Sequence, residues 1–222
     1  MQLSSKIPTM SSELLCEILC PQAKAGEKHN VVSTFKKISA ISTESAATEG
    51  SEPSLGLQIF NNVIGQPEEA GLFLFWRSME HHDGLSQTPG FAPAAQLFGD
   101  KIVPNLEIPL QPYYFWTRQV DVALLEAPCC EVVEMKVPAS VNADAIAAAM
   151  NAVFDNVTLP EGFLGLFYGL QHENPETLMV VTKWATSKGV INNDSWLRES
   201  ENRLQSILQG KAQIQSRRQM YA

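Results

Sequence analysis

The sequence has few of the features that mark nucleic-acid-binding or membrane proteins. Only 16 lysines and arginines stand against 24 aspartates and glutamates among its 222 residues, a formal net charge of -8. An acidic surface repels a phosphate backbone, so we expect no nucleic-acid partner. No stretch approaches the roughly 20 apolar residues that a membrane helix needs, and the start of the chain lacks an apolar signal core. The expectation is a cytoplasmic protein with no membrane partner.

Motifs that hold cofactors are equally scarce. The four cysteines form no CxxC pair and are accompanied by only four histidines, so no zinc site is expected. Cys16, Cys20, Cys129 and Cys130 are expected to be reduced, buried thiols, with a reactive thiol as the alternative. The sequence shows neither a glycine-rich phosphate loop nor a nucleophile elbow. It therefore predicts no nucleotide, flavin or metal cofactor.

What the sequence does contain is an internal repeat. A Leu-Gly-Leu triplet occurs at residues 55–57 and again at 164–166, and each precedes a Pro-Glu pair. A tryptophan follows that proline by nine residues in both copies, at Trp76 and Trp184. Ahead of these features, apolar runs end at Pro21 and Pro138, and each has a glutamate four residues before the proline. Matched features in one order indicate two diverged copies of one unit.

Each copy has the pattern of a βαββαβ unit. Strands are expected at 14–20, 57–63, 71–77 and 113–117, and again at 132–137, 164–170, 178–184 and 212–218. Helices are expected near 31–38 and over 91–98, 143–157 and 195–209. Residues 42–54 and 100–112 are predicted to be loops. The resulting division is a tail at 1–12, repeat one at 13–120, a linker at 121–129 and repeat two at 130–222. The predicted fold class is α+β, with two ferredoxin-like units.

Alternation along the first strand of each copy separates an apolar set from a mixed set. The apolar sets are Cys16, Ile18 and Cys20 in one copy and Val133, Met135 and Val137 in the other. The mixed sets contain the two matched glutamates, Glu17 and Glu134. We expect the apolar sets to lie beneath the helices and the mixed sets to face a cavity or the interface between the copies.

Three residue types have side chains suited to acid–base chemistry. The ordinary pKa of histidine lies near neutrality, which makes His82 a candidate proton shuttle; the alternative is that it only packs at a helix start. Glu17 and Glu134 lie within strands, where burial would raise the pKa of a carboxyl and make it a usable base. Their alternative role is a salt bridge between the copies, to Lys136, Arg77 or Lys183. His81 and His172 are expected to be exposed.

Aromatic side chains are candidates for lining a ligand cavity. The hydroxyl of Tyr114 is placed as a third catalytic group, able to polarise a carbonyl or hold an enolate. The predicted substrate-binding residues, besides Glu134, are Trp76, Phe60, Phe73, Tyr113, Trp116 and Tyr168. Aromatic residues on strands also build ordinary cores, which is the alternative for each of them.

The segment Trp76-Arg-Ser78-Met-Glu80-His-His82 resembles the W-x-S-x-E-x-H signature of the dimeric α+β barrel superfamily. This superfamily includes the antibiotic-biosynthesis-monooxygenase-like and stress-responsive barrel proteins. The resemblance implies a single-chain barrel made of two ferredoxin-like repeats, a tandem type typical of fungal secondary metabolism. Repeat two keeps Trp184 but continues with Ala-Thr-Ser-Lys, so the resemblance places the site in repeat one.

Three functions remain open from the sequence. The first is a cofactor-independent enzyme of secondary metabolism, cyclase- or isomerase-like, that uses acid–base chemistry on an aromatic or polyketide-type molecule. The second is a cofactor-free monooxygenase of an electron-rich phenol, the reaction implied by the family name. The third is a small-molecule-binding or stress-response protein without catalysis. Because one chain holds both repeats, either a monomer or a homodimer is compatible with the sequence.

Overall fold

The computed structural model of the chain describes residues 13–49, 55–117, 124, 126–154, 157–208 and 212–222. The predicted tail and residues 121–123 and 125 of the predicted linker lie outside these residues. The chain divides into two compact units, one formed by Leu14–Tyr114 and the other containing Phe115–Tyr221. We refer to them below as repeat one and repeat two. Within the described residues, no helix has the length and apolar character required to cross a membrane.

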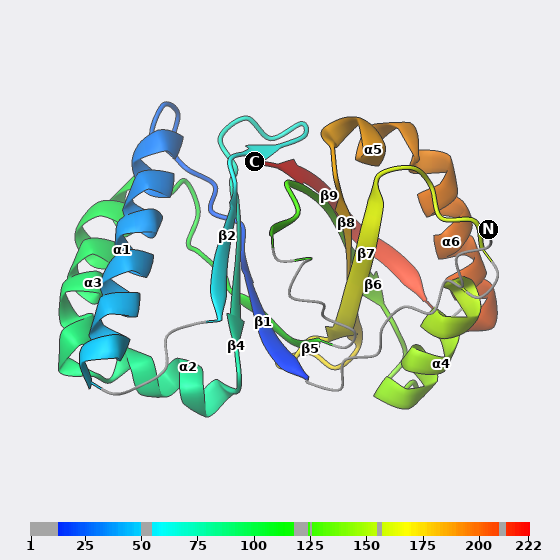
Figure 1. Cartoon of the computed structure of the whole chain (residues 1–222), viewed down its shortest axis with the longest axis horizontal. Helices are drawn as coiled ribbons and strands as arrows, with labels where there is room; N and C mark the ends of the chain where they lie inside the picture. The colour runs from blue at the N-terminus through cyan, green and yellow to red at the C-terminus, as the bar shows by residue number, and fades with distance from the viewer. Residues whose placement is uncertain (1–12, 50–54, 118–123, 125, 155–156, 209–211) are drawn as a thin grey trace. The chain divides into compact units, whose positions relative to one another are not determined.

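Repeat one is an antiparallel sheet with helices along one face (Figure 1). Its strands lie in the order β2-β4-β1-β5. Their bounds are β1 Leu14–Leu19, β2 Gly56–Phe60, β4 Gly71–Trp76 and β5 Tyr113–Thr117. A short strand, β3 Asn62–Val63, follows β2 in the chain and is not part of this sheet. The helical segments are α1 Lys28–Glu49, α2 Met79–Ser86, η1 Pro89–Phe91, α3 Ala92–Leu97, η2 Phe98–Ile102 and η3 Val103–Asn105.

Repeat two has the same organisation. Strands β6 Cys129–Lys136, β7 Phe163–Leu170, β8 Thr177–Trp184 and β9 Gln213–Tyr221 lie in the order β9-β6-β8-β7. The helices α4 Ala143–Phe154, α5 Ser187–Asn192 and α6 Asp194–Ile207 complete the unit. In both repeats the first strand therefore lies between the third and the fourth, which is the strand order of a ferredoxin-like unit. The predicted α+β class with tandem ferredoxin-like repeats is confirmed.

Two local predictions were wrong. Residues 42–49 are helical and extend α1, because the Ser42 and Thr43 hydroxyls donate to carbonyls four residues back, 2.8 and 2.9 Å away, instead of breaking the helix. Residues 100–105, expected to be part of a loop, form helical turns. A short helix, α2 or α5, follows each repeated tryptophan. Ser78 and Thr186 cap them, each hydroxyl accepting a backbone N–H at 3.1 Å.

The four thiols are free, as predicted, and three of them are buried while Cys20 is half-buried. Burial raises the pKa of Cys130 to about 12, so this thiol stays protonated and behaves as a small apolar side chain.

Candidate active site

A cavity of about 160 Å³ lies in repeat one, between the sheet and its helices. Apolar side chains form most of its wall, contributed by both the strands and the helices: Leu19, Phe35, Ile38, Leu57, Leu74, Leu85, Phe91 and Phe98. Glu17, Trp76 and His82 add polar atoms to the same wall. A cavity of this composition can bind an apolar ligand and orient it through a few polar groups.

The three residues predicted to be catalytic lie together beside this cavity. The Tyr114 hydroxyl donates to Glu17 Oε1 over 3.2 Å, and its oxygen lies 3.4 Å from His82 Nε2. His82 Nε2 is 3.8 Å from Glu17 Oε2. The Trp76 indole N–H donates to that same oxygen over 3.0 Å. The structure thus joins residues that are up to 97 positions apart in the chain.

The local sequence explains why His82 reaches this position. The Ser78 cap begins α2 immediately after β4 ends at Trp76, so the first turn of the helix returns toward the sheet. The His82 ring packs edge-on against Trp76, with 4.9 Å between the ring centroids, and lies 5.3 Å from the Tyr114 ring. These contacts restrict the orientation of the imidazole.

Asp83 is the hydrogen-bond partner of the other ring nitrogen of His82. His82 Nδ1 lies 2.9 Å from Asp83 Oδ1. An ionised carboxylate can only accept, so Nδ1 carries the hydrogen and donates it. In the neutral ring, Nε2 is then left with the lone pair, on the side of Glu17 and Tyr114. This is the tautomer that a general base requires.

Glu17 is an unusual carboxyl because it lies almost wholly inside the protein. Its side chain is 9% exposed. Burial raises the pKa of this carboxyl above its ordinary value of 4.5, while the neighbouring His82 charge and the hydrogen bonds from Trp76 and Tyr114 oppose the rise. The folded protein therefore binds a proton at Glu17 more tightly than the unfolded chain does.

This raised pKa gives a stability prediction. The contribution of Glu17 to the free energy of unfolding is greatest below pH 4.5 and is lost as the pH rises through the higher folded-state pKa. Glu17→Gln cannot ionise, so its melting temperature relative to wild type should rise between pH 4 and pH 8. Thermal unfolding across this range measures the change.

Glu80 provides a control of opposite sign for that experiment. Hydrogen bonds to its own backbone N–H and to Ser78 lower the pKa of this exposed carboxyl. Its contribution to stability is present above pH 4.5 and is lost as the pH falls, so Glu80→Gln should lose stability relative to wild type as the pH rises. If the stabilities of both variants relative to wild type changed with pH in the same direction, burial would not be what sets the pKa of Glu17.

Of the other residues predicted to bind substrate, one lines this cavity and the rest do not. Trp76 lines the cavity. Phe60 and Phe73 pack edge to face, with ring centroids 5.3 Å apart, on the opposite face of the sheet, since Leu57 and Leu74 occupy the cavity face.

Four predicted residues lie elsewhere. Tyr113 is half-buried, and strand alternation directs it away from the face of Tyr114. Trp116 and Tyr168 lie in the wall of a different hollow, which Ala143 and Ile146 of α4 also line. Glu134 accepts a hydrogen bond from Ser216 over 2.9 Å on the neighbouring strand. His81, expected to be exposed, is half-buried and accepts the Arg77 backbone N–H through Nδ1 at 3.3 Å.

The prediction of which strand face lies beneath the helices was wrong for repeat one. Glu17 and Leu19 face α1, where Leu19 packs with Val31 and Phe35, and Cys16 and Ile18 lie on the other face. Glu17 does face a cavity, but this cavity is beneath the helices. In repeat two the prediction is confirmed, because Val133, Met135 and Val137 pack under α4 and α6.

The pairing register explains this difference between the repeats. Glu17 pairs with Leu74, two residues before Trp76, and Glu131 pairs with Thr182, two residues before Trp184. The counterpart of Glu17 is therefore Glu131 and not Glu134. Strands β6 and β8 are longer than β1 and β4, so counting back from the proline selected the wrong glutamate.

Sequence reasoning missed two residues of this arrangement. Asp83 follows His82 directly in the chain, and a carboxylate beside a candidate base was a usable signal. Glu131 would have been found by counting from the tryptophan. Within the parts of the chain that are described, no three His, Cys, Asp or Glu side chains gather as a metal site would require.

Comparison with known proteins identifies the fold. No protein-family model and no curated protein matches the chain in sequence. Among solved structures, a proposed monooxygenase from Lactobacillus acidophilus NCFM matches with a TM-score of 0.57 and 10% identity, over 94% of this chain and 93% of that one. A proposed chlorite dismutase, TA0507, matches with a TM-score of 0.57 and 11% identity, over 94% of each chain.

A third structure, of an anthrone oxidase-like protein, has a TM-score of 0.52 and 12% identity and matches over 96% of each chain. These likenesses extend over nearly the whole chain in each case. They confirm the predicted fold, which this chain shares with all three structures.

Proposed function

We propose that the repeat-one cavity is the active site of a cofactor-independent enzyme that uses acid–base chemistry on a small aromatic or polyketide-type molecule. One observation carries this proposal. His82 and Glu17 meet at one part of a mainly apolar cavity, and the Tyr114 hydroxyl contacts both of them. Burying ionisable side chains costs free energy. Clusters of such side chains in a cavity are commonly functional sites.

In the proposed reaction, His82 Nε2 removes a proton from the substrate. Asp83 stabilises the resulting imidazolium at Nδ1, and Glu17 supplies a second negative charge 3.8 Å from Nε2. Both charges stabilise a cation that is absent in the ground state, which is how a general base lowers a barrier. The Tyr114 hydroxyl contacts both Glu17 and His82 and can pass a proton between them, and His82 returns a proton to the substrate from Nε2.

The cavity size restricts the substrate. An engineered apolar cavity of about 150 Å³ binds benzene. A cavity of about 160 Å³ therefore accommodates one aromatic ring, with a hydroxyl directed at His82. The substrate class we propose is a phenol, or one hydroxylated ring of a larger polyketide.

Two fates of the deprotonated substrate are open. Reprotonation at another position gives isomerisation or cyclisation. Reaction with dioxygen gives oxygenation, which is the candidate favoured by the match to an anthrone oxidase-like protein and a proposed monooxygenase. For anthrone, one O₂ would be consumed per molecule, yielding the quinone and one water. We place this chemistry in secondary metabolism, as the sequence resemblance implies.

Oxygen uptake with anthrone distinguishes these possibilities. Uptake that is stoichiometric with quinone formation and dependent on protein supports oxygenation, whereas a changed product without uptake supports isomerisation or cyclisation. Recovery of intact anthrone and of intact single-ring phenols after long incubation would favour a protein that only binds its ligand.

The role of Tyr114 can be tested with a matched pair of variants. Tyr114→Phe removes the hydroxyl that contacts Glu17 and His82 but keeps the ring, so turnover should fall about 10- to 100-fold, the worth of a hydrogen bond to a charged group. Tyr113→Phe removes a hydroxyl from the neighbouring strand position and should retain near-normal turnover. Equal losses in the two variants would contradict the assignment.

A further inference from the structure

Repeat two has a cavity of its own, at the position that the active-site cavity has in repeat one. It lies between the sheet and helices α4 and α6 and has a volume of about 40 Å³. Val133, Met135, Met150, Val153, Val180 and Leu204 form its apolar wall. Glu131, Thr182, Trp196, Ser200 and Glu201 contribute the polar part.

Glu131 presents an unused acceptor in this cavity wall. Its side chain is fully buried. Oε1 accepts from Arg217 over 3.0 Å and from Gln219 over 2.9 Å, whereas Oε2 is buried without a hydrogen-bond partner. The equivalent carboxylate of repeat one, Glu17, has a donor on each oxygen. A buried carboxylate oxygen without a donor is rare in native proteins, and a ligand is one of the explanations for it.

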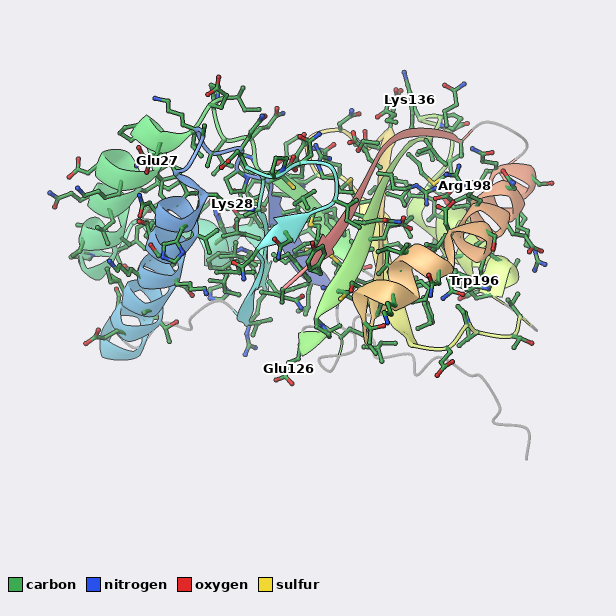
Figure 2. The ribbon with its side chains drawn as sticks, turned by 90° about the horizontal axis from the view of Figure 1, so that it is seen from above. Glu27, Lys28, Glu126, Lys136, Trp196 and Arg198 are labelled. Atoms are coloured by element: carbon green, nitrogen blue, oxygen red, sulfur yellow. The ribbon has the colours of Figure 1, made fainter. Side chains whose placement is uncertain are left out.

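Trp196 presents an unused donor in the same wall. It lies in the first turn of α6, next to the cavity (Figure 2). Its indole ring packs against Phe163 and Trp184, with centroids 5.2 and 6.1 Å away, so the ring is held in place. Its Nε1 is buried and has no acceptor. One wall of one small cavity therefore contains both a spare acceptor and a spare donor.

A hydroxyl group complements this pair. It can donate its hydrogen to Glu131 Oε2 and accept the Trp196 N–H on its oxygen. A carbonyl or nitrile could satisfy only Trp196, and an ammonium group only Glu131. The volume sets the upper size, because one water occupies about 30 Å³ of liquid and benzene required about 150 Å³.

We propose that repeat two contains a second small-molecule site, in which a hydroxyl compound of one to three heavy atoms bridges Glu131 Oε2 and Trp196 Nε1. Water and a short alcohol share this chemistry. The site binds without catalysing acid–base chemistry, because the position six residues after the tryptophan, His82 in repeat one, is Val190 in repeat two. Repeat two thus keeps the carboxylate and lacks the base.

Nuclear magnetic resonance of the tryptophan indole N–H groups tests the proposal on the intact chain. The sequence has four tryptophans, and Trp196 is assigned from the signal lost in Trp196→Phe. We expect a nuclear Overhauser contact between the Trp196 N–H and a long-lived water. We also expect a saturable shift with ethanol and clearly weaker binding of acetonitrile, which has the same number of heavy atoms and can accept the Trp196 N–H but cannot donate to Glu131.

Two variants make the test specific. Glu131→Gln should weaken ethanol binding at the Trp196 signal about tenfold or more, because a charge-assisted hydrogen bond is lost. Trp196→Phe keeps Glu131 and its ion pair. Its ethanol affinity, read from the Trp184 N–H that donates to Thr182 over 2.9 Å, should fall by a similar factor. If Glu131→Gln does not fold, the ethanol affinity of Trp196→Phe alone tests the proposal.

Each outcome has a defined meaning. A water contact with no ethanol shift supports the bridging hydroxyl and identifies it as water. An ethanol shift with no water contact supports the site and identifies the alcohol as its ligand. Neither signal, an equal response to acetonitrile, or unchanged ethanol affinity in Trp196→Phe would overturn the proposal. The Trp76 signal reports separately on the repeat-one cavity, so an effect there cannot be mistaken for this site.

Discussion

Replacing His82 by alanine should lower turnover by roughly 100- to 10,000-fold, the usual contribution of a positioned general acid or base. The fold should survive, because the His82 side chain is 23% exposed and occupies a single position in the first turn of α2. Such substitutions cost about 1 kcal/mol. Turnover of an accepted substrate and the melting temperature should be measured on the same preparation.

His172→Ala is the matched control for that experiment. His172 is exposed and lies outside the repeat-one cavity, so its removal should leave turnover close to wild type. A folded His82→Ala protein with wild-type turnover would show that His82 is not the base. If His82→Ala unfolds instead, then the histidine serves mainly to pack against Trp76.

Replacing Arg217 by alanine should lower the free energy of unfolding by about 3–5 kcal/mol, because a buried carboxylate loses its counter-ion. Arg217 Nη1 lies 3.0 Å from Glu131 Oε1, and Nη2 lies 2.6 Å from Glu201 Oε1. The side chains of Glu131 and Glu201 are only 0% and 12% exposed, so water cannot replace the lost guanidinium. Chemical denaturation at neutral pH measures this loss.

Arg198→Ala is the comparison variant. Arg198 Nε also binds a carboxylate, Asp194, over 2.6 Å, but the two side chains are 65% and 41% exposed. An exposed pair of this kind is worth about 0.3–0.5 kcal/mol. The defect of Arg217→Ala should also shrink at acid pH, where Glu131 and Glu201 are neutralised. Similar losses in the two variants would show that burial of the Glu131 network does not matter.

The sequence was sufficient to predict the architecture. The repeated tryptophans, Trp76 and Trp184, end equivalent strands, and the spacing back to the preceding proline is preserved because each hairpin has a fixed register. Because the same pattern occurs in both copies, weak strand and turn signals in one copy are supported by the matching signals in the other. This is why the order of elements could be predicted without other sequences.

The sequence was not sufficient to predict which face of a strand meets the helices. In β1 every residue from Leu15 to Leu19 is buried, so alternation distinguishes two faces but does not say which is covered. A carboxylate beneath a helix is also contrary to the expectation for a core. Glu17 is tolerated there because Trp76 and Tyr114 both donate to it, and these contacts join distant parts of the chain.

The two cavities differ in volume and in the partners of the buried carboxylate, a difference that the sequence only suggested. In repeat one, His82 and Tyr114 stand beside the buried carboxylate, and about 160 Å³ remains for a ligand. In repeat two, Arg217 and Gln219 bind the equivalent carboxylate, and about 40 Å³ remains. The same strand position has therefore diverged into a candidate base-supporting group and a structural ion pair.

The most direct test of the central claim is solvent deuterium exchange into phloroglucinol, a single-ring phenol of the size that the repeat-one cavity accommodates. Deprotonation of a hydroxyl gives a phenolate, which takes up a deuteron at a ring carbon and then loses the original ring proton. Exchange measured under nitrogen therefore isolates the acid–base step from any later reaction with oxygen. Wild-type protein should accelerate the exchange, and His82→Ala should lose at least about 100-fold of that acceleration. Binding that shifts the Trp76 indole signal, with equal exchange rates in wild type and His82→Ala, would contradict the account.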